Sequence, residues 1–317
     1  MITDPNVKIN LGLNILRKRE DGYHDLETLF VPYFGISDRL EIVIGDDYSR
    51  TSAYLFNRYG TDGPESQIAV KPEGVFGTET EESGFDRLVQ KMSEDGKVMI
   101  TIARAEGVDW DPLKDLTVKA YRVLAEDFEL PPVKIFLEKK SPVGAGLGGG
   151  SADAAFALKM INELCELGLS ELSLATYASR LGSDCAFFIY NRPMFGEGRG
   201  EVLTEFTSDV IRFNAEGYAP AGLDIQVVSP EGISVSTKDA YGGIVPHIPE
   251  VPLREVLSGP VERWKELLVN DFEATVFAKH PELAAIKQSL YDSGAVYASM
   301  SGSGSSLFAV YEKEQAR

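Results

Sequence analysis

The chain has 317 residues, with 31 Lys and Arg against 49 Asp and Glu, and its formal net charge is −18. This length predicts two domains of ordinary size. A protein that binds phosphates along a polymer needs a basic face, so the charge disfavours a general binder of nucleic acid or anionic membrane. It still allows one local pocket for a small anionic ligand.

The two cysteines, Cys165 and Cys185, are too few for a disulfide framework and do not have metal-ligand spacing. The N-terminus has no cationic region followed by an apolar run, and 18 uninterrupted apolar residues occur nowhere. We therefore expect a soluble protein of the reducing cytoplasm, without a targeting signal.

A strand is predicted over residues 7–15, where apolar and polar residues alternate strictly. Such a strand is half buried, and Lys8 and Asn10 belong to the face opposite the apolar stripe. Two further runs typical of strands, 26–34 and 39–44, follow and predict a β meander at the start of the chain.

Residues 46–110 are largely polar and acidic, and we interpret them as an inserted surface segment. Within this segment the spacing of apolar residues predicts a weak helix over 85–95 and a strand over 98–103. Regular structure resumes with a predicted helix over 116–128 and a strand over 133–138.

The last third of the chain alternates between strand and helix signals. Strands are predicted over 224–229, 295–300 and 307–311, and helices over 262–279 and 281–293. This order predicts a second compact α+β domain.

The strongest functional signal is a glycine-rich stretch between a predicted strand and a predicted helix. Glycines allow positive φ and close approach of a ligand to the main chain, and a helix start offers unpaired N–H groups, so we expect a phosphate here. The predicted phosphate-binding residues are Pro142, Val143, Gly144, Ala145, Gly146, Leu147, Gly148, Gly149, Gly150, Ser151 and Ala152.

Three common classes of phosphate loop do not fit this stretch. Its glycines formally satisfy the dinucleotide fingerprint, but a second helix follows where a strand ending in an acidic residue is required. A Walker A loop needs a lysine before Ser151, and the HRD and DFG triplets of protein kinases are absent.

The remaining pattern, P-x-G-x-G-L-G-G-G-S, resembles the second motif of the GHMP small-molecule kinases, in which the loop wraps the phosphates of ATP. VKINLGL near the N-terminus resembles the first motif, and ASMSGSGSSLFAV resembles the third. The resemblance implies a two-domain α+β fold, with a ribosomal protein S5 domain 2-like domain over 1–200 and a ferredoxin-like domain over 201–317.

Finer details resemble one group within that family. The chain carries DGYH at 21–24, GSD at 182–184 before two phenylalanines, and GRGE at 198–201. They resemble the members that phosphorylate the 2-hydroxyl of 4-diphosphocytidyl-2-C-methyl-D-erythritol in the non-mevalonate isoprenoid pathway. The resemblance covers residues 1–45 and about 114–311.

The resemblance also implies roles for single residues. Asp184 is expected to act as the general base on the acceptor hydroxyl, and Lys8 to orient and polarise that hydroxyl. Ser151 is the candidate hydroxyl near Mg²⁺, which accompanies ATP. The residues expected to bind the substrate are Asn10, Tyr23, His24, Thr237 and Tyr241.

One departure from the family pattern concerns Asp115, which stands where the family usually has an asparagine near the adenine.

Three alternatives remain at this point: a sister kinase acting on mevalonate or homoserine, a binding protein that has lost its activity, and a nicotinamide-dependent oxidoreductase. Tyr23, His24 and Tyr241 favour the cytidyl substrate, because neither mevalonate nor homoserine contains a nucleobase that could stack on an aromatic side chain. Both a monomer and a homodimer are compatible with the sequence.

Overall fold

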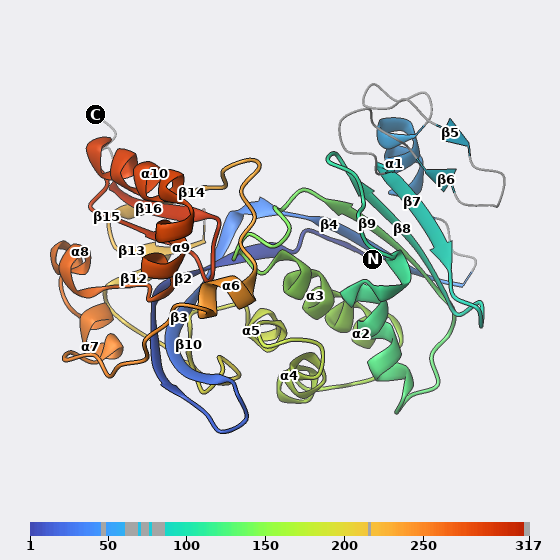
Figure 1. Cartoon of the computed structure of the whole chain (residues 1–317). Helices are drawn as coiled ribbons and strands as arrows, with labels where there is room; N and C mark the ends of the chain where they lie inside the picture. The colour runs from blue at the N-terminus through green and yellow to red at the C-terminus, as the bar shows by residue number, and fades with distance from the viewer. Residues whose placement is uncertain (46–48, 61–68, 71–75, 78–85, 215–216, 314–317) are drawn as a thin grey trace. The chain divides into compact units, whose positions relative to one another are not determined.

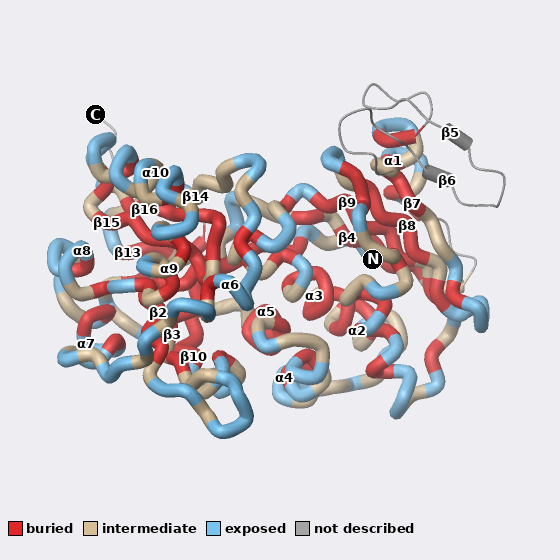
Figure 2. Tube along the Cα trace, viewed as in Figure 1, coloured by how far each residue is buried: buried red, intermediate tan, exposed pale blue. Residues whose placement is uncertain are grey.

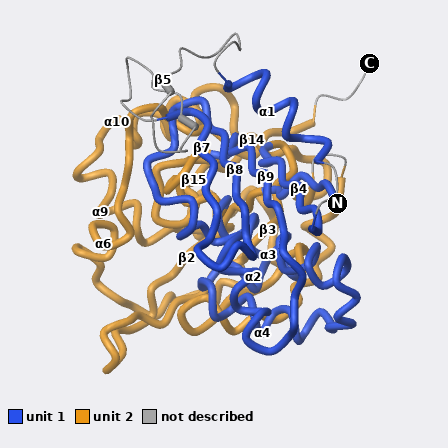
Figure 3. The backbone as a smooth tube through the Cα atoms, turned by 90° about the vertical axis from the view of Figure 1, so that its right-hand side faces the viewer, with its two compact units in different colours: residues 1–6, 36–141, 149–189 blue, residues 7–35, 142–148, 190–317 orange. Residues whose placement is uncertain are grey.

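The structure is a computed structural model that describes residues 1–45, 49–60, 69–70, 76–77, 86–214 and 217–313. It contains two compact units, coloured separately in Figure 3. Unit 1 comprises residues 1–6, 36–141 and 149–189, and unit 2 comprises residues 7–35, 142–148 and 190–317. Within the described residues, no helix has both the length and the apolar character needed to cross a membrane.

Unit 1 is built on a five-stranded sheet with the strand order β1-β4-β9-β8-β7. The strands are β1 (Ile2–Thr3), β4 (Arg39–Ile44), β9 (Val133–Lys139), β8 (Val98–Arg104) and β7 (Leu88–Met92). Strands β8 and β9 run parallel, with Ile100 opposite Ile135, and the other neighbours are antiparallel. Strands β8 and β9 carry buried apolar residues on both faces (Figure 2), as expected for a sheet that is covered on both sides.

Helices cover both faces of this sheet. Leu55 and Tyr59 of α1 pack with Val43 and Phe136 on one face, and Figure 1 shows α2 and α3 along the other. The helices of unit 1 are α1 (Ser52–Tyr59), α2 (Leu116–Ala125), α3 (Gly149–Leu164), α4 (Glu171–Ser179) and α5 (Cys185–Tyr190), with the 3-10 turn η1 (Pro112–Lys114) before α2.

Unit 2 contains two antiparallel sheets. The larger has the order β11-β10-β3-β13-β12, with β2 also paired to β3, and the smaller has the order β14-β16-β15. The strands of the larger sheet are β2 (Asn6–Lys18), β3 (His24–Ser37), β10 (Met194–Glu197), β11 (Val202–Glu205), β12 (Ile211–Asn214) and β13 (Gly217–Pro220). Those of the smaller sheet are β14 (Leu223–Val228), β15 (Tyr297–Met300) and β16 (Leu307–Glu312).

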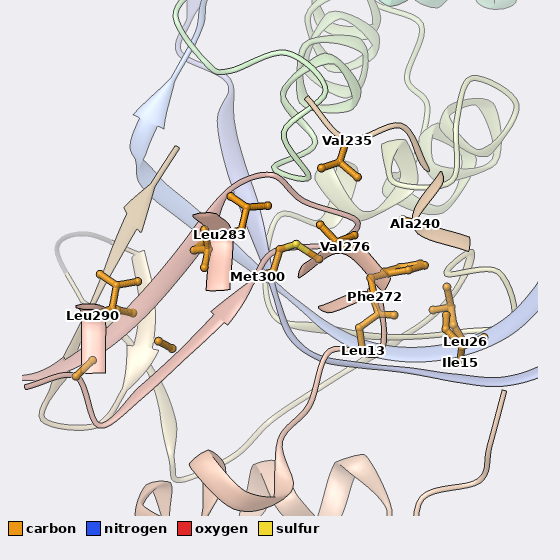
Figure 4. Close-up of a cluster of buried hydrophobic side chains, with 14 residues drawn as sticks. Leu13, Ile15, Leu26, Val235, Ala240, Phe272, Val276, Leu283, Leu290 and Met300 are labelled. Carbon is orange, nitrogen blue, oxygen red and sulfur yellow. The ribbon is translucent and has the colours of Figure 1, made fainter. Parts of the chain in front are cut away.

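The core of unit 2 joins the smaller sheet to β2 and to the C-terminal helices (Figure 4). Leu13 and Ile15 of β2 lie in one buried cluster with Phe272, Leu283 and Met300. The helices of this unit are α6 (Thr237–Tyr241), α7 (Leu253–Ser258), α8 (Trp264–Leu267), α9 (Phe272–Lys279) and α10 (Pro281–Asp292), with the 3-10 turn η2 (Val261–Arg263).

The predicted α+β class is confirmed, and several local predictions are wrong. Residues 88–92 are the strand β7, paired with β8, instead of a helix. The strand predicted over 98–103 is confirmed as β8, so both segments belong to the sheet and not to an appended loop. The rest of the predicted acidic insertion lies partly outside the described residues.

The opening strands do not form a meander, because β4 joins a different sheet from β2 and β3. The predicted helix over 262–279 is interrupted between α8 and α9. The predicted domain boundary after residue 200 stays a prediction.

Candidate active site

Lys8 lies in β2, in the centre of a hydrogen-bond network within unit 2. Its Nζ donates to Asn10 Oδ1 at 2.6 Å and to the Gly146 carbonyl at 2.8 Å. Asn10 Nδ2 donates in turn to Thr28 Oγ1 at 3.0 Å, and Thr28 Oγ1 donates to the Gly12 carbonyl at 2.6 Å. Lys8 is only 3% exposed and Asn10 2%, so the prediction of a half-buried strand is wrong: both faces of β2 are buried here.

The phosphate loop is joined to this strand and to the third motif. The backbone N–H of Lys8 donates to the Leu147 carbonyl at 2.9 Å, and that of Ser306 donates to the Ala145 carbonyl at 3.1 Å. Ser301 Oγ donates to the Gly146 carbonyl at 3.0 Å, the same oxygen that accepts from Lys8. The parts of the three sequence motifs that lie in unit 2 are therefore in direct contact.

Two glycines are required by this packing. Gly146 has φ +78°, and a Cβ there would collide with the Ser301 carbonyl and lie 3.1 Å from the Gly304 N–H. Gly302 has φ +56°, and a Cβ there would lie 3.4 Å from both Lys8 Nζ and Asn10 Oδ1. Only glycine allows both the positive φ and the close approach of the two backbones.

In unit 1 the second half of the predicted phosphate motif forms the first turn of α3, which begins at Gly149. Ser151 in this turn shares a side-chain hydrogen bond with Cys185, the first residue of α5. Asp184 directly precedes α5, is half buried, and contacts Ser183 Oγ at 3.3 Å. The hydrogen bond between Ser151 and Cys185 joins the start of α3 to the residue that follows Asp184. A shared role of Ser151 and Asp184 in one site stays a prediction.

Cys185 directly follows Asp184, and its side chain is buried. Burial, the largest influence, raises the pKa of its thiol to about 12, the Asp184 carboxylate adds to the shift, and the hydrogen bond with Ser151 opposes it. The thiol is therefore neutral at physiological pH. Sequence reasoning gave Cys185 no place in the site.

A second network in unit 1 was also missed by the sequence analysis. Lys139 Nζ forms an ion pair with Asp38 and another with Asp153 Oδ2 at 2.7 Å, and all three residues are buried. Asp38 Oδ1 accepts the backbone N–H groups of Lys140 at 2.6 Å and of Ser141 at 2.7 Å. Lys139 is adjacent in sequence to the glycine-rich stretch, which is the one signal that could have drawn attention to it.

The pKa directions in this network follow from burial and from the mixed charges. Burial raises the pKa of Asp153 well above its ordinary value, and Lys139 opposes that shift less strongly. Burial acts to lower the pKa of Lys139, but Asp153 and Asp38 outweigh it and hold that pKa above its ordinary value. Lys139 therefore carries its charge at neutral pH.

The residues predicted to bind the substrate base are only partly together. His24 begins β3 and stacks on Tyr241 of α6, with ring centroids 4.9 Å apart and planes at 21°. Burial, and then Lys18, lower the pKa of His24, which favours its neutral form. Tyr23 is 57% exposed and lies beside Arg199, whose guanidinium carbon is 5.0 Å from the ring centroid. Thr237, the first residue of α6, is exposed.

Asp115 has a structural position that its place in the sequence pattern did not predict. Its carboxylate caps α2 by accepting the N–H of Thr117 at 2.9 Å, and it also accepts Trp110 Nε1–H at 3.1 Å. These are acceptor roles, which a carboxylate performs at a helix start as well as an amide oxygen does.

Among the described residues, no group of three or more His, Cys, Asp or Glu side chains is arranged to hold a metal ion. A site that offers one protein hydroxyl, that of Ser151 in the first turn of α3, fits Mg²⁺ better than it fits a metal that needs a complete protein cage. Mg²⁺ keeps several waters and takes substrate phosphates together with one or two protein ligands.

Comparison with known proteins identifies the family of the chain. The GHMP kinases N terminal domain matches residues 115–192, and the GHMP kinases C terminal domain matches residues 253–317. A Bacteroides thetaiotaomicron relative named 4-diphosphocytidyl-2-C-methyl-D-erythritol kinase is 42% identical over 99% of this chain and 93% of its own length. A relative of the same name from Parabacteroides distasonis is 39% identical over 99% of this chain and 92% of its own.

Solved structures give the same result. A crystal structure of 4-(cytidine 5'-diphospho)-2C-methyl-D-erythritol kinase aligns with 98% of this chain and 89% of its own, with a TM-score of 0.63 and 26% identity. A crystal structure of mevalonate kinase has a TM-score of 0.55 at 10% identity, which shows a shared fold alone. The chain therefore belongs to the GHMP kinase family, in the group of its relatives named 4-diphosphocytidyl-2-C-methyl-D-erythritol kinase.

Proposed function

We propose that the protein transfers the γ-phosphoryl group of ATP to the 2-hydroxyl of 4-diphosphocytidyl-2-C-methyl-D-erythritol. The observation that carries this proposal is the 42% identity to a kinase of that name along 99% of the chain. The contacts of Lys8 with the phosphate loop support it, because they place a cation beside the backbone that would hold the phosphates. The chemistry would serve the non-mevalonate isoprenoid pathway, in the cytoplasm.

Phosphoryl transfer asks a protein mainly to position its reactants and to offset negative charge. In our proposal the N–H groups of residues 143–152, which follow Pro142, bind the ATP phosphates, helped by the positive end of the α3 dipole. Ser151 would hold Mg²⁺, and the bound ion would supply positive charge to offset the negative charge of the ATP phosphates. The chain itself is strongly acidic, so this local compensation matters more than its net charge.

Asp184 accepts the proton of the 2-hydroxyl as its oxygen attacks the γ-phosphorus, and the bond from that phosphorus to the leaving β-phosphate oxygen breaks. Its half-buried position before α5 suits a group that must meet the substrate. Lys8 orients and polarises the same hydroxyl, and Asn10 holds Lys8 in place through their 2.6 Å hydrogen bond. Transfer is direct and needs no nucleophilic side chain.

The cytosine stacks on Tyr23 in this proposal, since that ring is exposed and has an aromatic face to offer. His24 and Tyr241 already stack on each other, so a base cannot lie between them without separating the two rings. We therefore assign His24 to the edge of the base, and Tyr241 and Thr237 to the neighbouring wall of the binding site.

The proposal is tested by measuring ADP release from ATP with the cytidyl alcohol, mevalonate and homoserine offered in parallel. We expect turnover with the cytidyl alcohol alone. Turnover of mevalonate or homoserine without turnover of the cytidyl alcohol would show a sister kinase. If none of the three alcohols leads to ADP release while ATP still binds, the result would favour a binding protein that has lost its activity.

A further inference from the structure

Two buried carboxylates of unit 1, three residues apart in the sequence, accept the same kinds of hydrogen bond from different segments of the chain. Asp38 accepts two consecutive backbone N–H groups and the Ser141 hydroxyl, the last at 2.7 Å. Glu41 accepts the N–H groups of Arg50 and Thr51 at 2.9 and 2.8 Å, and the Ser49 hydroxyl at 2.7 Å. Asp38 therefore holds the residue before the phosphate loop, whereas Glu41 holds the segment before α1.

Lys139 extends the Asp38 network to the other end of the loop. Its Nζ pairs with Asp38 and with Asp153 Oδ2, and it also lies 3.2 Å from Ser141 Oγ. Asp153 belongs to the first turns of α3, which follow the loop, while Ser141 immediately precedes it. One ammonium group therefore ties together the two ends of the chain segment 142–148.

The two ends are also in direct steric contact. A Cβ at Gly149 would collide with Ser141 Oγ and would lie 3.4 Å from Lys139 Nζ. The helix start and the residue before the loop are therefore as close as glycine allows. The network therefore holds together the two residues, Ser141 and Gly149, between which the segment 142–148 runs.

Stability alone is a poor explanation for the network. A buried cluster of three ionisable side chains is commonly no more stabilising than apolar residues of the same size, because desolvation offsets the attraction. Asp153 Oδ1 moreover finds no hydrogen-bond partner among the described residues, a cost that a purely structural core avoids. An arrangement of this kind is best explained by the geometry that it imposes on the loop.

We propose that Asp38, Lys139 and Asp153 are positioning residues for ATP. They hold the two ends of the phosphate loop at one separation, so that its N–H groups are already arranged for the phosphates before ATP arrives. Such preorganisation improves affinity by reducing the ordering that binding would otherwise require. The inference rests on the proposed binding of ATP by this loop, and not on the identity of the alcohol.

Asp38→Asn tests the proposal, with Glu41→Gln as its matched control. The asparagine puts an NH₂ group against the Lys139 ammonium and releases the loop end, whereas the glutamine disturbs a similar site away from the loop. Calorimetric titration of a non-hydrolysable ATP analogue should give a Kd raised about tenfold for Asp38→Asn and unchanged for Glu41→Gln. Both variants should melt at lower temperature, and kcat of Asp38→Asn at saturating ATP should fall much less than its Kd rises.

Asp153→Asn is the second variant, because it keeps the side-chain shape and tests the other end of the loop if Asp38→Asn does not fold. It should also raise the Kd for the analogue, and the double variant should lose less than the product of the two single effects, since both act through Lys139. Loss of melting temperature with an unchanged Kd in Asp38→Asn and Asp153→Asn would overturn the proposal. Because the titration uses no acceptor alcohol, this result is independent of a failure to phosphorylate the cytidyl substrate.

Discussion

Lys8 and Asp184 are the two residues expected to act on the acceptor hydroxyl, and they differ in how deeply they are buried. Lys8 is 3% exposed in the middle of a strand, with its Nζ bound to Asn10 and to the loop carbonyl of Gly146. Asp184 is half buried and precedes a helix of six residues. The lysine is therefore part of the folded interior, whereas the aspartate is a group at the margin of its unit.

This difference predicts how replacement of each residue affects stability and activity. Removal of a buried donor leaves its acceptors without a partner and destabilises the fold as well as the chemistry. Replacement of a half-buried carboxylate just before a short helix should affect the chemistry more than the stability. Function and stability should therefore be coupled at Lys8 and separable at Asp184.

The largest effect is expected for Asp184→Asn. The amide cannot accept the hydroxyl proton, so kcat should fall by about 10²–10⁴, with nearly the same melting temperature and the same affinity for ATP. Steady-state kinetics and calorimetry on one preparation measure all three. A kcat within a few-fold of the parent would show that Asp184 is not the general base.

Lys8→Met should lower kcat by about 10²–10³, because a positioned cation beside transferring phosphate is lost. It should also reduce the free energy of unfolding by about 1–3 kcal/mol, since Asn10 Oδ1 and the Gly146 carbonyl lose a buried donor. Lys18→Met, at the exposed end of the same strand, is the control and should change neither quantity appreciably. Equal melting temperatures for Lys8→Met and the parent would contradict the coupling proposed for Lys8.

Gly146→Ala tests whether the loop on the Lys8 side is as rigidly packed as its contacts indicate. The new Cβ meets the Ser301 carbonyl and requires a positive φ, so we expect a loss of about 1–3 kcal/mol in stability and weaker ATP binding. Gly144→Ala is the matched control, because its φ is +70° but nothing lies within 4 Å of the added Cβ. If both variants lose the same stability, backbone strain and not packing determines the result.

Tyr23→Ala should have the smallest effect on the enzyme as a whole. Loss of one stacked base is expected to raise KM for the cytidyl alcohol about tenfold, while KM for ATP and the melting temperature remain nearly unchanged. Phe213→Ala removes a comparably exposed ring elsewhere in unit 2 and should alter neither KM. A similar rise of both KM values in Tyr23→Ala would exclude a role confined to the base.

The helices and strands near the motifs were largely predictable from the sequence. Asp115 and Ser170 mark the starts of α2 and α4 and accept backbone N–H groups there, as helix caps do. Residues 88–92 were predicted wrongly because Leu88, Val89 and Met92 fit a helical face equally well. Pairing with β8, a tertiary effect, decides in favour of the strand.

The buried polar groups of the site could not be predicted in the same way. Strict alternation in β2 indicated one polar and exposed face, but Lys8 and Asn10 are enclosed by the loop carbonyl and by Thr28. Lys139 had no signal beyond its position, since most lysines lie on the surface. Which charged residues find partners inside the protein depends on contacts between distant segments, and local periodicity carries no information about them.

Cys185 has a practical consequence for work on this protein. Its thiol lies next to the expected base and has a pKa of about 12, so it is almost entirely protonated at neutral pH. The thiolate is the form that reacts with alkylating agents and oxidants, and its scarcity protects this position. We therefore expect Cys185 to stay unmodified when an alkylating agent is added to the folded protein at neutral pH.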